Sequence, residues 1–365
     1  MKILEVCMSR GFGGLELYVL KVTKFLKENN YDYNVISRKN SFMFNKLQDE
    51  NISTKIFTSV FHLLPLFSAL KLANYIRSNK IDVLHVHWGK DLLFVVLAKV
   101  FSRKKVKLIY TRHMALTRKK DDFYHRFLYR NIDAYLTITQ ELSIVAENYL
   151  PLDKNKIHLV YHGVPAAENV PANCPSYLQE SGLDEHAFRL VIFGRIEKGK
   201  GQHLVLNAVK ELKNKGLNIQ LAIIGHIMDK DYFNSLQTEI KSNNLENTIF
   251  YLGFHNSPTS IMACFDAVIL ATKCETFGLV LPEAMRAGVA VIGSNCGGVP
   301  EIITHEETGL LFETENVDDL TTQLLKIVSS HEYCEKLAKA GKEEADERFS
   351  EEKHFNRLIE IFESA

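Results

Sequence analysis

The sequence predicts an α/β protein made of two Rossmann-like domains, each built on a doubly wound parallel sheet. The chain has 365 residues, which suits two domains of ordinary size. Short apolar strands alternate with helix-length segments, a pattern typical of βαβ units and parallel sheets. A stretch rich in Pro, Ala and Asn at 163–175 interrupts this pattern, which then restarts. We therefore expect an N-terminal domain over 1–168, a C-terminal domain over 169–348, and a last helix over 349–365 that packs back on the N-terminal domain.

Each half supplies the elements in order. In the first half, we expect strands at 2–7, 33–36, 82–87, 107–111 and 134–139, and helices at 15–28, 91–101 and 141–149. In the second half, we expect strands at 189–193, 219–224, 248–252, 267–271 and 290–292, and helices at 201–215, 232–242 and 282–287. Two open parallel sheets bind ligands at the carboxyl ends of their strands, so we expect the site in a cleft between the domains.

Composition places the chain among soluble globular proteins. It is 46% hydrophobic and 24% charged, and we find neither a transmembrane segment nor a secretory signal. The cysteines form no CxxC pair, so we expect reduced cytosolic thiols with neither a disulfide framework nor a zinc site. The six are Cys7, Cys174, Cys264, Cys274, Cys296 and Cys334.

The net charge of zero hides two halves of opposite sign. Residues 1–170 hold 26 Lys and Arg against 15 Asp and Glu, whereas residues 171–365 hold 18 against 29. A basic half indicates an anionic partner such as a membrane surface, a phosphorylated acceptor or a nucleic acid. The alternative is that opposite charges only help the two halves face each other. We expect no nucleic acid, because basic and aromatic residues are not interleaved on any known module.

A glycine-rich loop at 9–16 connects the first strand to the first helix. Glycines there let backbone amides approach a phosphate, and the helix N-terminus favours negative charge. The dinucleotide pattern GxGxxG fails, because Glu16 stands where its last glycine would be, and the second strand runs into Ser37-Arg38-Lys39 without the expected acid. A phosphate loop and a simple tight turn both remain open for this segment.

Two segments of the second half carry groups suited to a phosphorylated sugar. The segment Gly194-Arg195-Ile196-Glu197-Lys198-Gly199-Lys200-Gly201 follows a strand and forms a cationic cradle for a diphosphate; the alternative is a solvated lysine-rich loop. In the segment 275–283, we expect Glu275 in the loop before a helix and Glu283 in the first turn of that helix. Carboxylates at these two positions can accept hydrogen bonds from sugar hydroxyls. Helix-dipole complementarity for Glu283 and a plain surface charge for Glu275 are the alternatives.

Together these segments resemble the retaining glycosyltransferases of family 4, which have the GT-B fold, over nearly the whole chain. The most specific matches are Gly194-Arg195 with Lys200-Gly201, and the two glutamates followed by Ala284-Met285-Arg286-Ala287-Gly288. Further matches are Gly13-Gly14-Leu15-Glu16, Asp82-Val83-Leu84-His85-Val86-His87, Gly297-Gly298-Val299-Pro300-Glu301 and Thr308-Gly309-Leu310-Leu311. His162-Gly163-Val164 departs slightly, because the family usually has Asn where His162 stands.

The resemblance implies a role for each matched residue. Arg195 and Lys200 would neutralise the donor diphosphate, Glu275 would hold hydroxyls of the donor sugar, and Glu283 would hold the ribose. His113 matches the family histidine beside the reacting sugar. The remaining donor-binding residues would line the sugar–diphosphate path, namely Gly13, Gly14, Phe277, Gly278 and Leu279. His85 and His87 share a face of their strand, and because we find no third ligand we interpret them as packing or lining residues.

The resemblance also implies the reaction. We expect transfer of a hexose-type sugar, with retention, from a nucleotide diphosphate sugar to a hydroxyl of a glycan or lipid-linked acceptor in lipopolysaccharide or cell-surface polysaccharide synthesis. UDP-sugars are slightly favoured over GDP-sugars. No Asp-x-Asp pair suits Mg²⁺, so we expect no metal and no cofactor. The alternatives are another GT-B enzyme such as a sugar-nucleotide epimerase, or a catalytically idle nucleotide-sugar binding module.

The same reasoning locates the protein. In this fold the first domain receives the acceptor, and its basic residues concentrate at 103–107 and 118–120, with apolar residues at 61–67. We therefore expect a cytoplasmic protein, peripheral on the anionic inner face of the cytoplasmic membrane. Burial of 61–67 in a core is the alternative.

Overall fold

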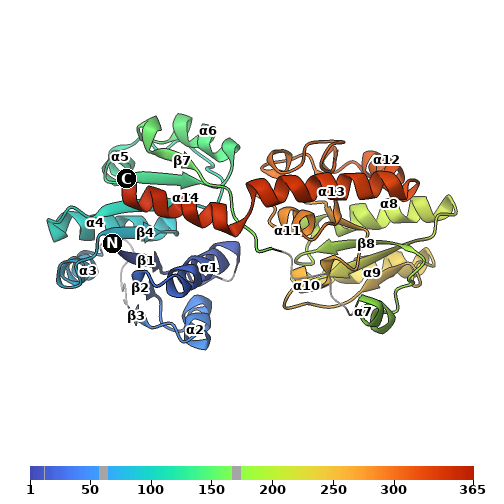
Figure 1. Cartoon of the computed structure of the whole chain (residues 1–365), viewed down its shortest axis with the longest axis horizontal. Coiled ribbons are helices and arrows are strands. Elements are labelled where there is room, and N and C mark those ends of the chain that lie inside the picture. The colour runs from blue at the N-terminus through green and yellow to red at the C-terminus, as the bar shows by residue number, and fades with distance from the viewer. Residues whose placement is uncertain (12, 57–64, 167–173) are drawn as a thin grey trace. The chain divides into compact units, whose positions relative to one another are not determined.

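The computed structural model describes residues 1–11, 13–56, 65–166 and 174–365 (Figure 1). The chain divides into two compact units, the first containing residues 1–161 and 354–365, the second residues 162–353. The expected boundary at 168/169 lies outside the described residues. Within the described residues, no helix is both long and apolar enough to cross a bilayer.

Unit 1 is built on a seven-stranded sheet in which all neighbouring strands are parallel. The strand order is β3-β2-β1-β4-β5-β6-β7, so the order reverses between β1 and β4. Ligands of such sheets bind where the order reverses, outside the carboxyl ends of the strands. The strands are β1 (Lys2–Cys7), β2 (Asp32–Ser37), β3 (Thr54–Ile56), β4 (Val83–Val86), β5 (Lys107–Arg112), β6 (Ala134–Thr137) and β7 (Ile157–Leu159).

Helices cover both faces of this sheet, as its doubly wound class requires. One buried cluster joins the sheet to α3 and α4, and a second joins the opposite face to α1 and α14. Helix α14 comes from the C-terminus of the chain and buries Phe355, Leu358, Ile361 and Phe362 in unit 1. The helices are α1 (Gly14–Glu28), α2 (Phe42–Asp49), α3 (Leu66–Ser78), α4 (Leu92–Ser102), α5 (Phe123–Arg130), α6 (Gln140–Tyr149) and α14 (Glu351–Ser364), with 3₁₀ turns at Gly89–Asp91 and Lys154–Lys156.

Unit 2 repeats the arrangement with six parallel strands in the order β10-β9-β8-β11-β12-β13. Its order reverses between β8 and β11, so the loops after these two strands are neighbours. Both sheets confirm the predicted pair of Rossmann-like, doubly wound domains. The strands are β8 (Phe188–Phe193), β9 (Ile219–Ile224), β10 (Ile249–Tyr251), β11 (Ala267–Leu270), β12 (Ala290–Ser294) and β13 (Leu310–Phe312).

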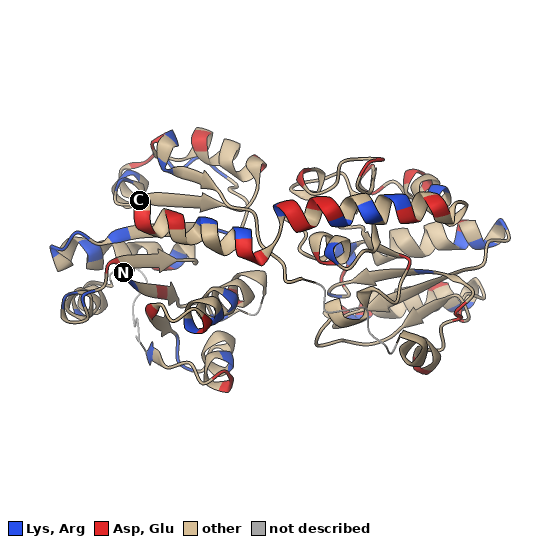
Figure 2. Cartoon of the chain, viewed as in Figure 1, with Lys and Arg blue, Asp and Glu red and all other residues tan. Residues whose placement is uncertain are grey.

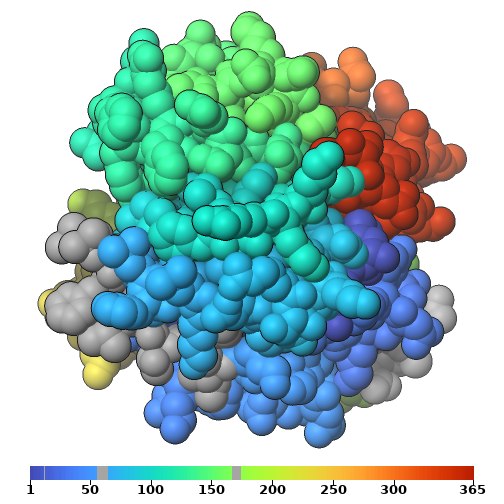
Figure 3. All heavy atoms as spheres, turned by 90° about the vertical axis from the view of Figure 1, so that its left-hand side faces the viewer, coloured from blue at the N-terminus to red at the C-terminus, as the bar shows by residue number. Residues whose placement is uncertain are grey.

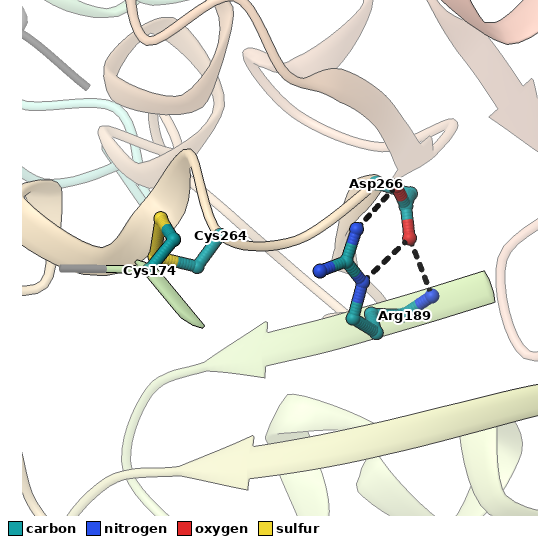
Figure 4. The surroundings of a disulfide bond; sticks show 4 residues. All are labelled: Cys174, Arg189, Cys264 and Asp266. Carbon is teal, nitrogen blue, oxygen red and sulfur yellow. Dashed lines mark hydrogen bonds and ion pairs between the residues drawn. A yellow bond between two sulfur atoms is a disulfide. The ribbon is translucent and has the colours of Figure 1, made fainter. Parts of the chain in front are cut away.

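In unit 2, one large buried cluster packs α8, α9, α12 and α13 on the strands. A bidentate ion pair between Arg189 and Asp266 ties the starts of β8 and β11 together, with Nε–Oδ2 and Nη2–Oδ1 distances of 3.0 and 3.1 Å (Figure 4). The helices are α7 (Cys174–Ser181), α8 (Gln202–Asn214), α9 (Lys230–Ser242), α10 (Thr259–Met262), α11 (Val280–Arg286), α12 (Val317–Val328) and α13 (His331–Arg348), with 3₁₀ turns at Lys198–Lys200 and Val299–Glu301.

One sequence prediction is wrong: Cys174 and Cys264 form a disulfide (Figure 4). The bond joins the first residue of α7 to the loop after α10, and the two Cα atoms lie 5.3 Å apart. Because 90 residues separate the two cysteines, their spacing in the sequence carried no signal of the pairing. The other four cysteines are free thiols.

Candidate functional site

In unit 2, the fold brings the two charged segments of the sequence together. Thr272 Oγ1 and the Lys273 amide both donate to the carbonyl of Gly199, at 3.1 and 3.0 Å. Gly201 has a φ of +73°, and a Cβ added there would lie 1.9 Å from the carbonyl oxygen of Ala271. The loop after β8 therefore packs directly on the loop after β11, at an approach that only glycine permits.

Two of the predicted site residues pair with each other across these loops. Lys200 Nζ lies 2.9 Å from Glu275 Oε2, and the two side chains are only 23% and 21% exposed. Arg195, the other predicted cation, is more exposed and pairs with Glu197 at 2.9 Å. Both cations are therefore already paired with carboxylates. An incoming diphosphate would have to displace these carboxylates or share the cations with them.

The segment after Glu275 is held in a shape that presents backbone amides. Gly278 has a φ of +90°, which favours glycine. Phe277 is 2% exposed, and its ring packs against His162 and Phe349, so its side chain belongs to the core. In the described parts of the chain, the amides of Gly278 and Leu279 donate to no acceptor. Glu283 follows in the first turn of α11.

The neighbouring loop after β12 contacts the backbone of Glu275. The Gly298 amide donates to the Glu275 carbonyl at 3.2 Å, and a Cβ on Gly297 would lie 1.8 Å from that carbonyl oxygen. The loop after β12 therefore fixes the backbone of Glu275. The site of unit 2 lies at the carboxyl ends of β8, β11 and β12, where the order of the strands reverses.

Near this site, an aromatic pair escaped sequence reasoning. His226 and Phe254 are exposed and stacked, with ring centroids 3.8 Å apart. They follow β9 and β10, and the His226 carbonyl accepts the Ile196 amide of the charged loop at 2.8 Å. Only the fold could reveal this pair, because the two residues lie on separate loops.

In unit 1, the glycine loop leads into α1 as the sequence predicts. Gly13 caps the helix in an extended conformation and Gly14 begins it, with open space where a Cβ would stand on Gly14. The Glu16 carboxylate is buried beside the loop, with its Oε1 3.2 Å from the position of a Cβ on Gly11. Phe12 lies outside the described residues.

His113 follows β5 and lies within a chain of buried polar groups. Its Nε2 is 3.4 Å from His87 Nδ1, and the Tyr18 ring packs against it with centroids 4.9 Å apart. His87 Nε2 lies 2.7 Å from Glu5 Oε2, while Glu5 Oε1 lies 3.0 Å from His85 Nδ1. A continuous path of hydrogen bonds therefore runs from Glu5 through His87 to His113.

Glu5 is a residue of this buried cluster that sequence reasoning missed, and it adds a carboxylate to His85 and His87, whose predicted role is packing or lining. The spacing of the two histidines in the sequence indicates no third ligand. In the sheet, Glu5 is paired in register with His85, which explains how one carboxylate reaches both rings. The signal in the sequence was a lone acid inside an otherwise apolar strand.

The protonation of this cluster follows from its burial. Burial opposes ionisation of Glu5, but the charge of His85 and hydrogen bonds from both histidines lower its pKa to about 2. Burial, reinforced by His85, lowers the pKa of His87 to about 4, so His87 is neutral at pH 7. Neutral His87 donates through Nε2 to Glu5, which leaves its Nδ1 to accept from His113 Nε2.

This cluster also contains the residue types that bind metals. Among the described residues, Glu5, His85 and His87 form the only such group with ligand atoms within 4.8 Å of one another. Two ligands of one tetrahedral zinc ion stand about 3.3 Å apart, given bonds of about 2 Å. The contacts of 2.7 and 3.0 Å instead have hydrogen-bond lengths, and a metal would have to push the groups apart.

The ten predicted site residues fall into one set per unit. His113, Gly13 and Gly14 belong to unit 1, where Tyr18, one turn beyond Gly14, links the helix start to His113. Unit 2 holds the other set, Arg195, Lys200, Glu275, Phe277, Gly278, Leu279 and Glu283. In each unit, the set lies at the carboxyl ends of strands next to the reversal of strand order.

Comparisons with known proteins agree with this geometry. The family model described as Glycosyl transferases group 1 matches residues 175–344, and the model Glycosyltransferase Family 4 matches residues 12–168. The chain is similar to the N-acetyl-alpha-D-glucosaminyl L-malate synthase of Bacillus anthracis, at 25% identity over 96% of this chain and 93% of the relative.

Two further relatives share the resemblance. The N-acetylgalactosamine-N,N'-diacetylbacillosaminyl-diphospho-undecaprenol 4-alpha-N-acetylgalactosaminyltransferase of Campylobacter jejuni is 27% identical over 75% of this chain and 74% of its own length. Among solved structures, Anabaena Alr3699/HepE in complex with UDP superimposes with a TM-score of 0.88 at 20% identity, covering both chains completely.

Proposed function

Because the chain belongs to the family 4 glycosyltransferases of the GT-B fold, we propose that it moves a hexose-type sugar from a nucleotide diphosphate sugar to a hydroxyl of a glycan or lipid-linked acceptor. The observation that carries the proposal is the Lys200–Glu275 pair. In this pair, a cation suited to binding a diphosphate is hydrogen-bonded to a carboxylate suited to binding a sugar. The bond that breaks in the reaction joins these two parts of the donor.

On the donor side, the residues of unit 2 divide the work. Lys200 and Arg195 bind the diphosphate and stabilise the negative charge that grows on it as the glycosidic bond breaks. The amides of Gly278 and Leu279 supply further donors to its oxygens. Glu275 accepts hydrogen bonds from the sugar and Glu283 from the ribose. With these cations in place, the reaction needs no metal ion to neutralise the leaving group.

On the acceptor side, His113 meets the reacting sugar. Donation from His113 Nε2 to His87 fixes one tautomer and one orientation of the imidazole at the end of β5. Glu5 and His87 act as positioning residues that fix this tautomer. We propose retention at the anomeric carbon, with the acceptor hydroxyl attacking on the face that the diphosphate leaves.

The identity of donor and acceptor is the finer part of the proposal. Support for UDP comes from Anabaena HepE, whose structure is a complex with UDP. The exposed His226–Phe254 pair next to the charged loop offers an aromatic face for the base. One relative's name includes L-malate, and another's includes a diphospho-undecaprenol glycan. A lipid-linked acceptor places the protein in lipopolysaccharide or cell-surface polysaccharide synthesis, at the inner face of the cytoplasmic membrane.

We propose that three consecutive exposed cations, Arg103–Lys105, attach unit 1 to an anionic membrane (Figure 2). Lys107 is excluded from this role, because its Nζ donates to the carbonyls of Phe362 and Glu363 in α14. Phe67 and Phe123, each 89% exposed, add apolar surface at the starts of α3 and α5. Residues 61–64 of the expected apolar segment lie outside the described residues.

Vesicle flotation tests the membrane proposal. Each cation near an anionic surface contributes about 1 kcal/mol, so changing all three of Arg103–Lys105 to Glu should weaken binding at least about 100-fold. Lys213→Glu with Lys215→Glu in unit 2 is the control. Wild-type protein that ignores anionic vesicles at low salt would favour a soluble acceptor.

The enzymatic proposal is tested first by binding and then by turnover. UDP-glucose and GDP-mannose are titrated calorimetrically, and slow donor hydrolysis is then followed without acceptor. Lys200→Ala should lower turnover at least about tenfold, whereas Lys198→Ala, an exposed lysine of the same loop, should not. Equal rates in both variants would refute the role of Lys200. Binding without turnover on any acceptor would indicate an idle binding module, and isomerised donor an epimerase.

A further inference from the structure

Unit 1 contains a pocket of about 380 Å³ that none of the predicted site residues lines. Its walls come from the turn after β4, the end of β5 and its following loop, and α5. Figure 3 shows the side of the molecule that α3 (blue) and α4 (cyan) cover. The lining includes Trp88, Lys90, Tyr110, Arg112, Lys120 and Tyr124.

The charge of the pocket is unbalanced. Lys90, Arg112 and Lys120 all line it, and in the described part of the chain no carboxylate lies within 4 Å of their nitrogens. His125, another residue of the pocket wall, is paired with the carboxylate of Asp122. Burial lowers the pKa of Lys120, and repulsion by Arg112 and Arg118 lowers it further. An anion in the pocket would relieve this repulsion.

The cations are held in place by the surrounding chain. Arg112 Nε donates to the Met114 carbonyl at 2.7 Å, and Nη2 donates to the Ala115 carbonyl at 2.9 Å. Its Nη1 donates to the Tyr110 hydroxyl at 3.1 Å. These neutral acceptors fix the guanidinium and leave its positive charge for a ligand, so little side-chain entropy is lost on binding.

The rest of the wall is aromatic and apolar. Lys90 Nζ lies 5.3 Å above the centre of the Trp88 ring, and Tyr124 and Leu93 also line the pocket. Ring faces of this kind pack against the C–H face of a sugar or against a hydrocarbon chain. The pocket thus combines binding groups for an anion with binding groups for the organic part of the same ligand.

The pocket lies next to the proposed reaction centre. Arg112 and His113 are consecutive, so their Cα atoms are about 3.8 Å apart. Their side chains leave opposite faces of the sheet, since Arg112 bonds to Tyr110 while His113 meets His87 and Tyr18. A ligand anchored by Arg112 therefore starts at the strand end that carries His113.

We propose that this pocket binds the phosphate or diphosphate group of the acceptor. The inference rests on the proposed transferase function and adds the chemical class of its second substrate. A free sugar phosphate and a lipid-linked diphosphate share this chemistry, and the experiment below separates them. In either case, the anion holds the acceptor while its hydroxyl reaches the anomeric carbon of the donor.

The test uses Trp88, which is the only tryptophan of the chain and lines the pocket. Its fluorescence is followed while wild-type protein is titrated with glucose 6-phosphate, farnesyl diphosphate and, as a neutral control, glucose. We expect a saturable change with at least one of the two anions and none with glucose. A response to glucose 6-phosphate alone indicates a soluble acceptor, and a stronger response to farnesyl diphosphate a lipid-linked one.

Matched variants decide whether the signal comes from the pocket. Lys90→Met and Lys120→Met should each weaken anion binding at least tenfold, whereas Lys119→Met, an adjacent lysine paired with Asp121, should leave it unchanged. No response to either anion, or equal affinity in all three variants, would overturn the proposal. UDP-glucose affinity, measured by calorimetry on the same variants, should not change. If wild-type protein does not bind UDP-glucose, this result would instead count against the proposed function itself.

Discussion

Removing the Glu275 carboxylate should strengthen the binding of a nucleoside diphosphate while it slows sugar transfer. In the structure, Glu275 occupies Lys200 at 2.9 Å, so a diphosphate must compete with it for the cation. Exposed ion pairs contribute 0.2–1 kcal/mol, and this pair is mostly buried, so we take about 1 kcal/mol. The Glu275→Ala variant should then bind UDP up to about fivefold more tightly than wild type.

Turnover should move the other way. A hydrogen bond to a charged group contributes about 1.5–3 kcal/mol, so losing the proposed contact of Glu275 with the sugar should slow donor hydrolysis at least about tenfold. Calorimetry with UDP and initial rates of UDP-glucose hydrolysis measure the two effects. Glu315→Ala, which breaks the exposed pair with Lys273, is the control and should change neither. UDP binding weakened tenfold with hydrolysis intact would show that Glu275 serves the nucleotide and not the sugar.

The remaining predictions concern the metal, the loops and the stability of unit 1. Exhaustive EDTA treatment should leave transfer unchanged; a loss restored by Mg²⁺ or Mn²⁺ would reveal a metal site. Gly201→Ala should destabilise the protein by at least about 1–3 kcal/mol in denaturant titrations, because its Cβ meets the Ala271 carbonyl, whereas Gly199→Ala, with open space around it, should be neutral. Burial lowers the pKa values of His87 and His354 from 6.5 to about 4. As the pH falls, these histidines are therefore protonated in the unfolded chain before they are protonated in the folded protein. Between pH 6.5 and 4, each of them should lower the free energy of unfolding by up to about 3 kcal/mol. Unfolding titrations at pH 7.5 and 5 that give equal stability would contradict this.

The sequence predicted the central strands well because they are continuous apolar runs. The expected bounds of β1 and β9 agree with the structure to the residue. The short edge strands β3, β7 and β13 escaped, since three residues give little pattern to separate a strand from a loop; β10, equally short, was predicted at 248–252.

The site was predictable only as far as its residues are neighbours in sequence. The two loops of unit 2 each carry a local charge pattern next to a strand end, which located Lys200 and Glu275. Their pairing, and that of Glu5 with His87, depends on which strands are adjacent, so it could not be read from spacing. The Cys174–Cys264 bond was hidden for the same reason.

The position of α14 has a consequence for how the protein is made. Tyr18 of α1 bonds to His354 at 3.0 Å, and His354 in turn bonds to the Tyr161 carbonyl at 2.7 Å, so the last helix joins both ends of the first 161 residues. Its apolar side chains fill one face of the sheet in unit 1. During translation, the first sheet therefore emerges from the ribosome long before the helix that covers it, and must wait, with that face open, for the synthesis of nearly 200 further residues. The second unit, by contrast, has its whole sequence available before the first is complete. A nascent chain stalled before residue 354 would thus present a finished second unit and a first unit with one face of its sheet open, a state that chaperones and proteases can recognise.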